Sequence, residues 1–298
     1  VFTYPCVASY LGGDIVAGIV ASNFINGNKL TLYIDIGTNG ELALGNAEWL
    51  VGCSCSAGPA FEGAGVKDGV RSIPGAIEKV SIEPDSFEVV LSTIGNHAPV
   101  GICGSGLIDL LAELFLAGVI NNRGKFNRGL ATNRLREGKY GLEFVVAWVP
   151  MTGVNRDIVI TEVDIDNLMR AKAAIYAGMT TLVESVGLKL SDVEQVLIAG
   201  SFGNFIKIQE AVTIGLLPDV PVERFKFVGN GSLLGAAKAA INSEVREAAA
   251  KVTRSLSYLE LSADPGFMDK YVSALFLPHT DIKQFPSVAG RLNLRKVI

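Results

Sequence analysis

Short apolar runs alternate along almost the whole chain with longer segments whose apolar residues recur at helical spacing. Strands are predicted by the apolar runs at residues 29–36, 80–82, 87–94, 193–199 and 225–228. Helices are predicted at residues 14–24, 107–116 and 164–186, the last with Asp164 or Asp166 as its N-cap and Gly187 just beyond its end. This alternation predicts an α/β fold.

Glycine-rich turns follow three of the predicted strands. Asp35 lies near the end of the first strand, and Asn39-Gly40 in the following turn predicts a type I′ hairpin with positive φ at both residues. The second turn is Gly200-Ser201-Phe202-Gly203, and the third, Gly229-Asn230-Gly231-Ser232, begins a helix. Each turn alone is compatible with a purely structural role, but strand ends are where open α/β sheets bind ligands, so together they predict a ligand site.

The chemistry of these turns suits a nucleotide with magnesium. The Thr38 hydroxyl and the N–H groups around it can bind phosphate, and Asp35 can hold Mg²⁺, through water, because this ion gives up its hydration shell reluctantly. Gly200 and Gly203 would let a flat ring approach the backbone. Helix N-termini near Ser232 and in the turn Gly104-Ser105-Gly106 carry partial positive charge that favours anions.

Composition argues against two kinds of partner. The chain of 298 residues is 49% hydrophobic and only 19% charged, below the roughly 25% usual for soluble domains, which suggests that part of its surface is normally covered. A net charge of −4 argues against nucleic acid. The most apolar stretch, 107–120, is shorter than the roughly 20 residues of a membrane helix, so no membrane partner is expected. The chain shows no signal peptide and opens on Val1, and we expect a piece of a larger, cytoplasmic protein.

The four cysteines, Cys6, Cys53, Cys55 and Cys103, have spacings that fit neither zinc nor iron–sulfur ligation. Cys53 and Cys55 are compatible with a metal site or with two buried thiols. No disulfide framework is evident, which favours a reducing compartment. We therefore expect no iron–sulfur cluster within this chain.

Two familiar nucleotide-binding motifs are missing. No G-x-x-x-x-G-K-[ST] sequence occurs, which argues against a P-loop protein. In GICGSGLID, Asp109 occupies the third glycine position of the dinucleotide fingerprint, which argues against a Rossmann site.

The order of DIGTNGE, VLIAGSFGNFIKIQEAV and FVGNGSLLGAAKAA resembles the second half of the actin, sugar-kinase and heat-shock-chaperone (ASKHA) superfamily. GGDIVAGIVAS, just upstream, looks like the first connecting helix of that superfamily. CSCSAGPAFEGAG, PGAIEKV, GICGSGLIDLLAEL, MRAKAAIYAGM and AGSFGNF further resemble the reductive activators of corrinoid proteins. The resemblance runs from about Leu11 to about Pro278.

The resemblance implies roles for individual residues. Four residues match the second phosphate motif of the superfamily, and the match implies that they contact ATP phosphates and Mg²⁺. They are Asp35, Gly37, Thr38 and Asn39. Those matching the adenosine motif are Gly200, Ser201 and Gly203, and those matching the segment that closes under the nucleotide are Gly229, Asn230 and Gly235.

Other residues keep two interpretations. Lys172 and Arg170 match a helix that contacts adenine in chaperone-like relatives, yet Lys172 is also compatible with a solvated helix charge. Glu41, Glu62 and Asp109 are candidates to orient the attacking water or to be structural. Both histidines, His97 and His279, lie outside the three turns, and we expect no role for them.

The resemblance implies an RNase H-like ASKHA fold, a mixed sheet flanked by helices with an inserted helical subdomain. We expect one nucleotide-binding domain, with its core at about 29–102 and 192–242, the inserted subdomain at about 103–191 and a C-terminal extension at about 255–298. No second Asp-x-Gly-Thr is present to supply the superfamily's earlier phosphate hairpin. The chain therefore resembles the nucleotide lobe of a longer activator, separated from its iron–sulfur domain.

The function implied is ATP hydrolysis, with Mg²⁺, coupled to reduction of Co(II) to Co(I) in the corrinoid protein of a methyltransferase system. Turnover should be slow, because no strong catalytic base is evident. Two alternatives stay open: a small-molecule kinase related to pantothenate or sugar kinases, and a nucleotide-binding scaffold without catalysis. A kinase would transfer phosphate to a hydroxyl acceptor, and a scaffold would form nucleotide-dependent oligomers.

Overall fold

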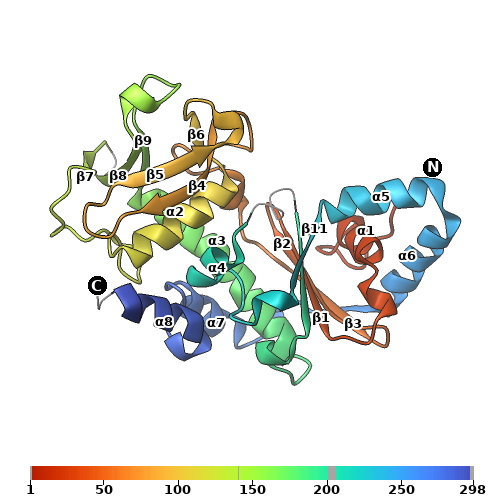
Figure 1. Ribbon diagram of the computed structural model, residues 1–298. Coiled ribbons are helices and arrows are strands. Elements are labelled where there is room, and N and C mark those ends of the chain that lie inside the picture. The colour runs from red at the N-terminus through yellow and green to blue at the C-terminus, as the bar shows by residue number, and fades with distance from the viewer. Residues whose placement is uncertain (1, 140, 201–205, 296–298) are drawn as a thin grey trace. The chain divides into compact units, whose positions relative to one another are not determined.

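The computed structural model describes residues 2–139, 141–200 and 206–295, with side chains described as far as residue 293. The chain forms two compact units (Figure 1). The first unit comprises Val1–Ser56, Ala177–Asn204 and Val220–Lys270, and the second comprises Ala57–Tyr176, Phe205–Asp219 and Tyr271–Ile298. The core expected at 29–102 and 192–242 is thus divided between the two units.

A six-stranded mixed sheet forms the centre of the first unit, in the order β11-β10-β1-β2-β3-β12. Its strands are β1 (Thr31–Ile36), β2 (Gly40–Gly45), β3 (Leu50–Cys55), β10 (Gln195–Ala199), β11 (Phe225–Gly229) and β12 (Leu256–Tyr258). β2 is antiparallel to β1 and β3, whereas β10 is parallel to both β1 and β11. The carboxyl ends of β1, β10 and β11 therefore meet at one edge of the sheet.

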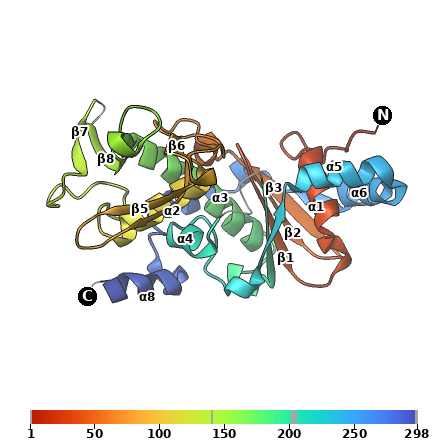
Figure 2. The same cartoon turned by 45° about the horizontal axis from the view of Figure 1, so that its top comes forward.

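Three helices of the first unit gather on one side of this sheet, as two views show (Figures 1 and 2). They are α1 (Gly13–Ser22), α5 (Gly231–Ile241) and α6 (Ser243–Ser255). Glycines bring α1 and α5 close together: a Cβ on Gly235 would lie 2.3 Å from the carbonyl oxygen of Ala17. The core on this side includes Ile15, Ile19, Tyr33, Leu197 and Val252.

The second unit holds two three-stranded sheets, β5-β4-β6 and β7-β8-β9. Their strands are β4 (Ala76–Ile82), β5 (Val89–Thr93), β6 (Gly101–Ile102), β7 (Leu135–Gly138), β8 (Gly141–Ala147) and β9 (Ile158–Thr161). Its helices are α2 (Gly104–Leu116), α4 (Ile208–Thr213) and α8 (Pro286–Arg295), and two helices run from one unit into the other, α3 (Glu162–Glu184) and α7 (Phe267–Ala274). The expected inserted region thus contains a small sheet as well as helices.

Eight short 3₁₀ helices are also described, at Phe24–Asn26, Pro59–Glu62, Ile94–Asn96, Val149–Met151, Leu190–Asp192, Val222–Arg224, Leu261–Ala263 and Ile282–Gln284. Most of them lie in the connections between strands and helices.

Two local predictions are wrong. Asn39 and Gly40 are not among the described residues with positive φ, because Ile36 pairs with Gly40 and leaves a loop of three residues rather than the two of a type I′ turn. Helix α3 begins earlier than predicted. The Thr161 hydroxyl accepts from the N–H of Asp164, and the Asp164 carboxylate accepts from the N–H of Thr161, so Thr161 is the N-cap of a capping box.

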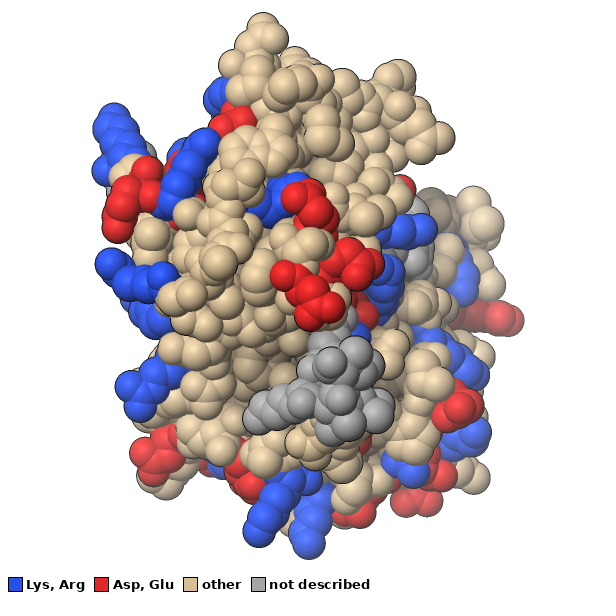
Figure 3. Space-filling model, turned by 60° about the vertical axis from the view of Figure 1, so that its left-hand side comes forward, with Lys and Arg blue, Asp and Glu red and all other residues tan. Residues whose placement is uncertain are grey.

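Uncharged side chains cover much of the face of the molecule in Figure 3, with one acidic group near its centre. The second unit exposes several large apolar side chains, among them Ile73, Val90, Val149 and Met151. Such exposure accords with the low charged fraction of the sequence. No helix in the described part of the chain is long and apolar enough to span a membrane.

Candidate functional site

The strands that precede the three predicted turns lie side by side and parallel, so β1, β10 and β11 end at one edge of the sheet. Asp35 pairs with Ala199, and Ala199 pairs in turn with Gly229. The N–H of Gly200 donates to the carbonyl of Gly229 at 3.1 Å, which joins the second turn to the third. Parallel pairing therefore brings together segments that are almost 200 residues apart in sequence.

The hairpin between β1 and β2 presents its tip at this edge. The N–H of Gly37 donates to the carbonyl of Asn39 at 2.9 Å, which closes the loop. Thr38 and Asn39 are exposed at the tip. The Asn39 amide hydrogen bonds to the Glu41 carboxylate, so this asparagine orients a site residue as well as forming the loop.

Asp35 and Glu41 face each other across the hairpin. They are directly paired in the antiparallel ladder, which places both side chains on the same face of the sheet. Both are only partly exposed. Asp14, in the first turn of α1, contributes a third negative charge that acts on both. We call Asp14, Asp35 and Glu41 the carboxylate cluster.

Burial and nearby negative charge raise the pKa values of two members of this cluster, Asp35 and Glu41. Desolvation raises the pKa of Asp35 to about 6, with a further contribution from the charge of Asp14. Desolvation also raises the pKa of Glu41 to about 7, assisted by Asp14 and Asp35 and opposed by its hydrogen bonds. No described Lys or Arg forms an ion pair with any of the three. Within the described part of the chain, negative charge is therefore concentrated here without an ion-paired Lys or Arg.

This charge imbalance fits a divalent cation. Neutralising two opposed, half-buried carboxylates would relieve both desolvation and repulsion. The described residues hold no group of three or more His, Cys, Asp or Glu arranged to ligate a metal directly. Mg²⁺ is usually bound by one or two carboxylates and keeps several waters, the mode expected from the sequence for Asp35.

Backbone conformation, close packing and helix capping explain the residues found in the glycine-rich turns. Gly200 has a φ of 114°, and a Cβ there would lie 2.3 Å from the carbonyl oxygen of Ile36. Gly229 has a φ of 76°. Asn230 caps α5, since its side chain accepts from the N–H of Leu233 at 2.9 Å. Gly235 is needed for the α1–α5 contact. Ser201 and Gly203 lie outside the described residues.

The remaining predicted site residues belong to the second unit. Gly104, Ser105 and Gly106 form the buried first turn of α2, and a Cβ on Gly106 would lie 2.2 Å from the carbonyl oxygen of Ile77. Glu62 is half-buried at the end of a 3₁₀ helix. The close approach of α2 to β4 therefore gives Gly106 a packing role independent of any ligand.

Asp109 is buried and already has protein partners. Its carboxylate accepts from the Lys207 ammonium at 2.5 Å and from the N–H of Val80 at 3.3 Å. Desolvation raises the pKa of this carboxyl, while the Lys207 ammonium opposes that shift. These contacts favour the structural interpretation of Asp109.

One of the two interpretations of Lys172, a solvated charge on a helix, is wrong. Its side chain is wholly buried, and its ammonium donates to the carbonyl oxygens of Phe276 and Pro278, the latter at 2.7 Å. Burial lowers its pKa well below the usual value. Arg170 is exposed and pairs with Asp166 one turn earlier on α3. Lys172 therefore anchors the segment at 276–278 to α3.

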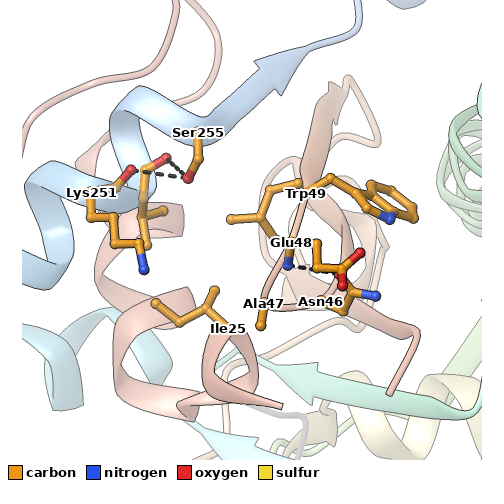
Figure 4. Close-up of a pocket in the computed structure, with 9 residues that line it drawn as sticks. Ile25, Asn46, Ala47, Glu48, Trp49, Lys251 and Ser255 are labelled. Atoms are coloured by element: carbon orange, nitrogen blue, oxygen red, sulfur yellow. Dashed lines mark hydrogen bonds between the residues drawn. The ribbon is translucent and has the colours of Figure 1, made fainter. Parts of the chain in front are cut away.

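Two cavities in the first unit lie away from the carboxylate cluster. One of about 100 Å³ lies between α6 and the turn at 46–49, with Lys251 and Ser255 on one side and Trp49 on the other (Figure 4). The other, of about 250 Å³, lies beside Thr31 and Gln195, the first residues of β1 and β10. Both are at the opposite ends of the strands from Asp35 and Glu41.

All four cysteines are free thiols, and they differ in burial. Cys53, Cys55 and Cys103 are buried, whereas Cys6 is exposed. The Cys53 thiol hydrogen bonds to Cys55, and this bond together with burial raises its pKa. These surroundings favour the buried-thiol interpretation of Cys53 and Cys55.

Asp14 is the functional candidate that the sequence pattern did not single out. It lies 21 positions before Asp35, in a helix whose other residues read as an ordinary apolar segment. Only its position in the first turn of α1, after two glycines, distinguishes it in the sequence. Its proximity to the other two carboxylates depends on how α1 packs on the sheet.

A mixed sheet with three parallel strands ending together, α1 packed against α5 and a carboxylate near the end of β1 define an α/β protein of the ASKHA fold class. Comparison with known proteins identifies the group within that class. A family model described as the C-terminal domain of RACo, the ASKHA domain, matches residues 29–289. The chain belongs to this family, and the predicted fold class is confirmed.

Sequence similarity to two named proteins supports this family assignment. The chain is 37% identical over 275 residues to the corrinoid activation enzyme RamQ of Eubacterium limosum, covering 90% of this chain and 46% of the relative. It is 27% identical over 296 residues to the [Co(II) methylated amine-specific corrinoid protein] reductase of Methanosarcina barkeri, covering 91% and 50%.

A solved structure, a reductive activator for corrinoid, iron-sulfur protein, matches with a TM-score of 0.92 and 54% identity. The match covers 95% of this chain and 45% of that one. The chain thus spans about half the length of the relatives it matches, and the predicted resemblance to reductive activators is confirmed.

Proposed function

We propose that this chain binds and hydrolyses ATP with Mg²⁺, as the nucleotide-dependent part of a reductive activator of corrinoid proteins. The activator would return a methyltransferase's corrinoid from Co(II) to Co(I). The observation that carries the proposal is the carboxylate cluster, which lies at the sheet edge where β1, β10 and β11 end. The names of the family's relatives supply the corrinoid partner.

Within this proposal, Asp35 and Glu41 would hold Mg²⁺ through its water ligands. The bound ion would neutralise phosphate charge and the repulsion between the two carboxylates. The Thr38 hydroxyl and the N–H groups of the hairpin tip would contact the phosphates, and Gly200, Ser201 and Gly203 would border the adenine.

We assign assistance in hydrolysis to Glu41 rather than to Asp35. In the ligand-free protein the pKa of Glu41 is raised to about 7 and that of Asp35 to about 6, so Glu41 is the stronger base of the two. The Asn39 amide fixes its orientation. Asp14 would raise the basicity of Glu41 through its negative charge, so its role in hydrolysis would be indirect.

The electron for Co(II) would come from an iron–sulfur domain outside this chain. One electron reduces one cobalt, and hydrolysis of ATP to ADP and phosphate supplies no electron. ATP can therefore help only if its bound form and its products favour different conformations or complexes. A state-dependent affinity for the corrinoid protein would meet this requirement.

Phosphate release from ATP, with and without a Co(II) corrinoid protein, tests the proposal. We expect slow hydrolysis that the corrinoid protein stimulates, and a loss of at least about 100-fold in Asp35→Ala. Asp85→Ala, which changes an exposed aspartate of the second unit, is the matched control. Unchanged ATP affinity and hydrolysis in Asp35→Ala would refute the assignment. Phosphate transfer to a hydroxyl acceptor would indicate a kinase instead, and nucleotide-dependent oligomers without hydrolysis a scaffold.

A further inference from the structure

Tyr33 carries a buried hydroxyl that makes no hydrogen bond within the described part of the chain. Its side chain is fully buried. Burial raises the pKa of the phenol, and the charges of Asp35, Asp14 and Glu41 raise it further. A buried hydroxyl without a partner destabilises the folded state, and native proteins leave few of them. This hydroxyl therefore calls for an explanation beyond packing.

The hydroxyl lies in the contact between α1 and α5. A Cβ on Gly18 of α1 would lie 2.0 Å from the Tyr33 oxygen, and a Cβ on Gly231 of α5 would lie 2.4 Å from it. Glycine at both positions makes room for the phenol. Any displacement of one helix along the other would change what surrounds this oxygen.

The contact between α1 and α5 shares two elements, β1 and α1, with the carboxylate cluster. Tyr33 precedes Asp35 by two residues on β1, so the two side chains share one face of the sheet. Asp14 lies one helical turn before Gly18 on α1, and Gly231 follows Asn230, the N-cap of α5. Ligand binding at the strand ends would therefore act directly on both helices that hold the hydroxyl.

We propose that Tyr33 is a positioning residue of the nucleotide site. Its hydroxyl gains a hydrogen-bond acceptor only when a magnesium nucleotide binds and the first turn of α5 shifts against α1. The bond then holds the two helices in the bound arrangement. This inference rests on the proposed nucleotide-binding function and assigns Tyr33 a part in it that requires no contact with the ligand.

Tyr33→Phe removes the hydroxyl and keeps the ring. Without nucleotide, we expect the melting temperature to stay the same or rise, because the hydroxyl has no bond to lose. With Mg²⁺ and ATP, the gain in melting temperature should be smaller than in the wild type. The Kd for ATP should rise about five- to tenfold, the equivalent of one hydrogen bond.

Tyr4→Phe is the matched control, because the Tyr4 hydroxyl also reaches α5 but donates to the carbonyl of Gly235 at 2.8 Å. This variant should melt at a lower temperature without nucleotide and keep the wild-type Kd. A Tyr33→Phe protein with wild-type affinity for ATP would overturn the inference, and so would one that melts lower without nucleotide, as Tyr4→Phe should. Absence of ATP binding by the wild type would instead refute the proposed function, and the inference with it.

Discussion

Replacing Asp35 by Asn should stabilise the ligand-free protein while abolishing its response to magnesium nucleotide. In the folded protein the carboxylate is half-buried, opposes Glu41 across the hairpin and has no described cation beside it. Asparagine has nearly the same shape and no charge. The substitution therefore removes the electrostatic cost with little change in packing.

The magnitude follows from the shift in pKa from 3.8 to about 6. At 1.36 kcal/mol per pKa unit, the ionised carboxylate destabilises the folded state by about 3 kcal/mol when no cation is bound. Partial exposure and the burial of a polar amide reduce the expected gain for Asp35→Asn to about 1–2 kcal/mol.

The raised pKa of Asp35 also fixes the direction in which the stability of the folded protein changes with pH. A raised pKa means that the folded protein holds this proton more tightly than the unfolded chain, so stability falls as pH rises from 3.8 to about 6. The Glu41 carboxyl adds a window from 4.5 to about 7. The stabilisation by Asp35→Asn should therefore be complete at pH 8 and nearly absent at pH 4.

Urea unfolding followed by circular dichroism at pH 8, 6 and 4 measures these differences. Asp14→Asn should give part of the same effect, because its charge contributes to both raised pKa values. Asp85→Asn should change little at any pH. An Asp35→Asn protein that is destabilised at pH 8, or that shows the same difference from wild type at all three pH values, would refute the reasoning.

Three further predictions concern packing and thiols. Gly235→Val should cost about 1–3 kcal/mol of stability, measured by urea unfolding, because its Cβ would lie 2.3 Å from the Ala17 carbonyl oxygen; wild-type stability would contradict the α1–α5 contact. Asp109→Asn should break the ion pair with Lys207 and speed amide hydrogen exchange in α4 without affecting the first unit; unchanged exchange in α4 would show that the pair is dispensable. A thiol reagent should react with one of the four cysteines, Cys6, in the native protein and with all four in denaturant. Rapid reaction of a second thiol would contradict the burial of the other three.

Local sequence patterns predicted the elements of the first unit that position the site. The apolar runs of β1, β10 and β11 and the glycine turns after them are encoded within a few residues each. Asn230 was predicted to begin a helix and does cap α5. No strand was predicted at β3, because the small residues Cys53, Ser54 and Cys55 resemble a loop in composition. They form a strand because β2 pairs with them residue by residue.

The site itself required the tertiary structure. Sequence by itself determined that Asp35 ends a buried strand and that two more glycine turns follow in a superfamily order, because strand ends and turns depend on neighbouring residues. Only the packing of α1 on the sheet brought Asp14 to Asp35 and Glu41, and only the α1–α5 contact enclosed the Tyr33 hydroxyl. Burial likewise gives Lys172 and Asp109 partners within the protein, since the same charged residues on an open helix face would be solvated. Proximity and desolvation arise between segments distant in the chain, and local sequence does not contain them.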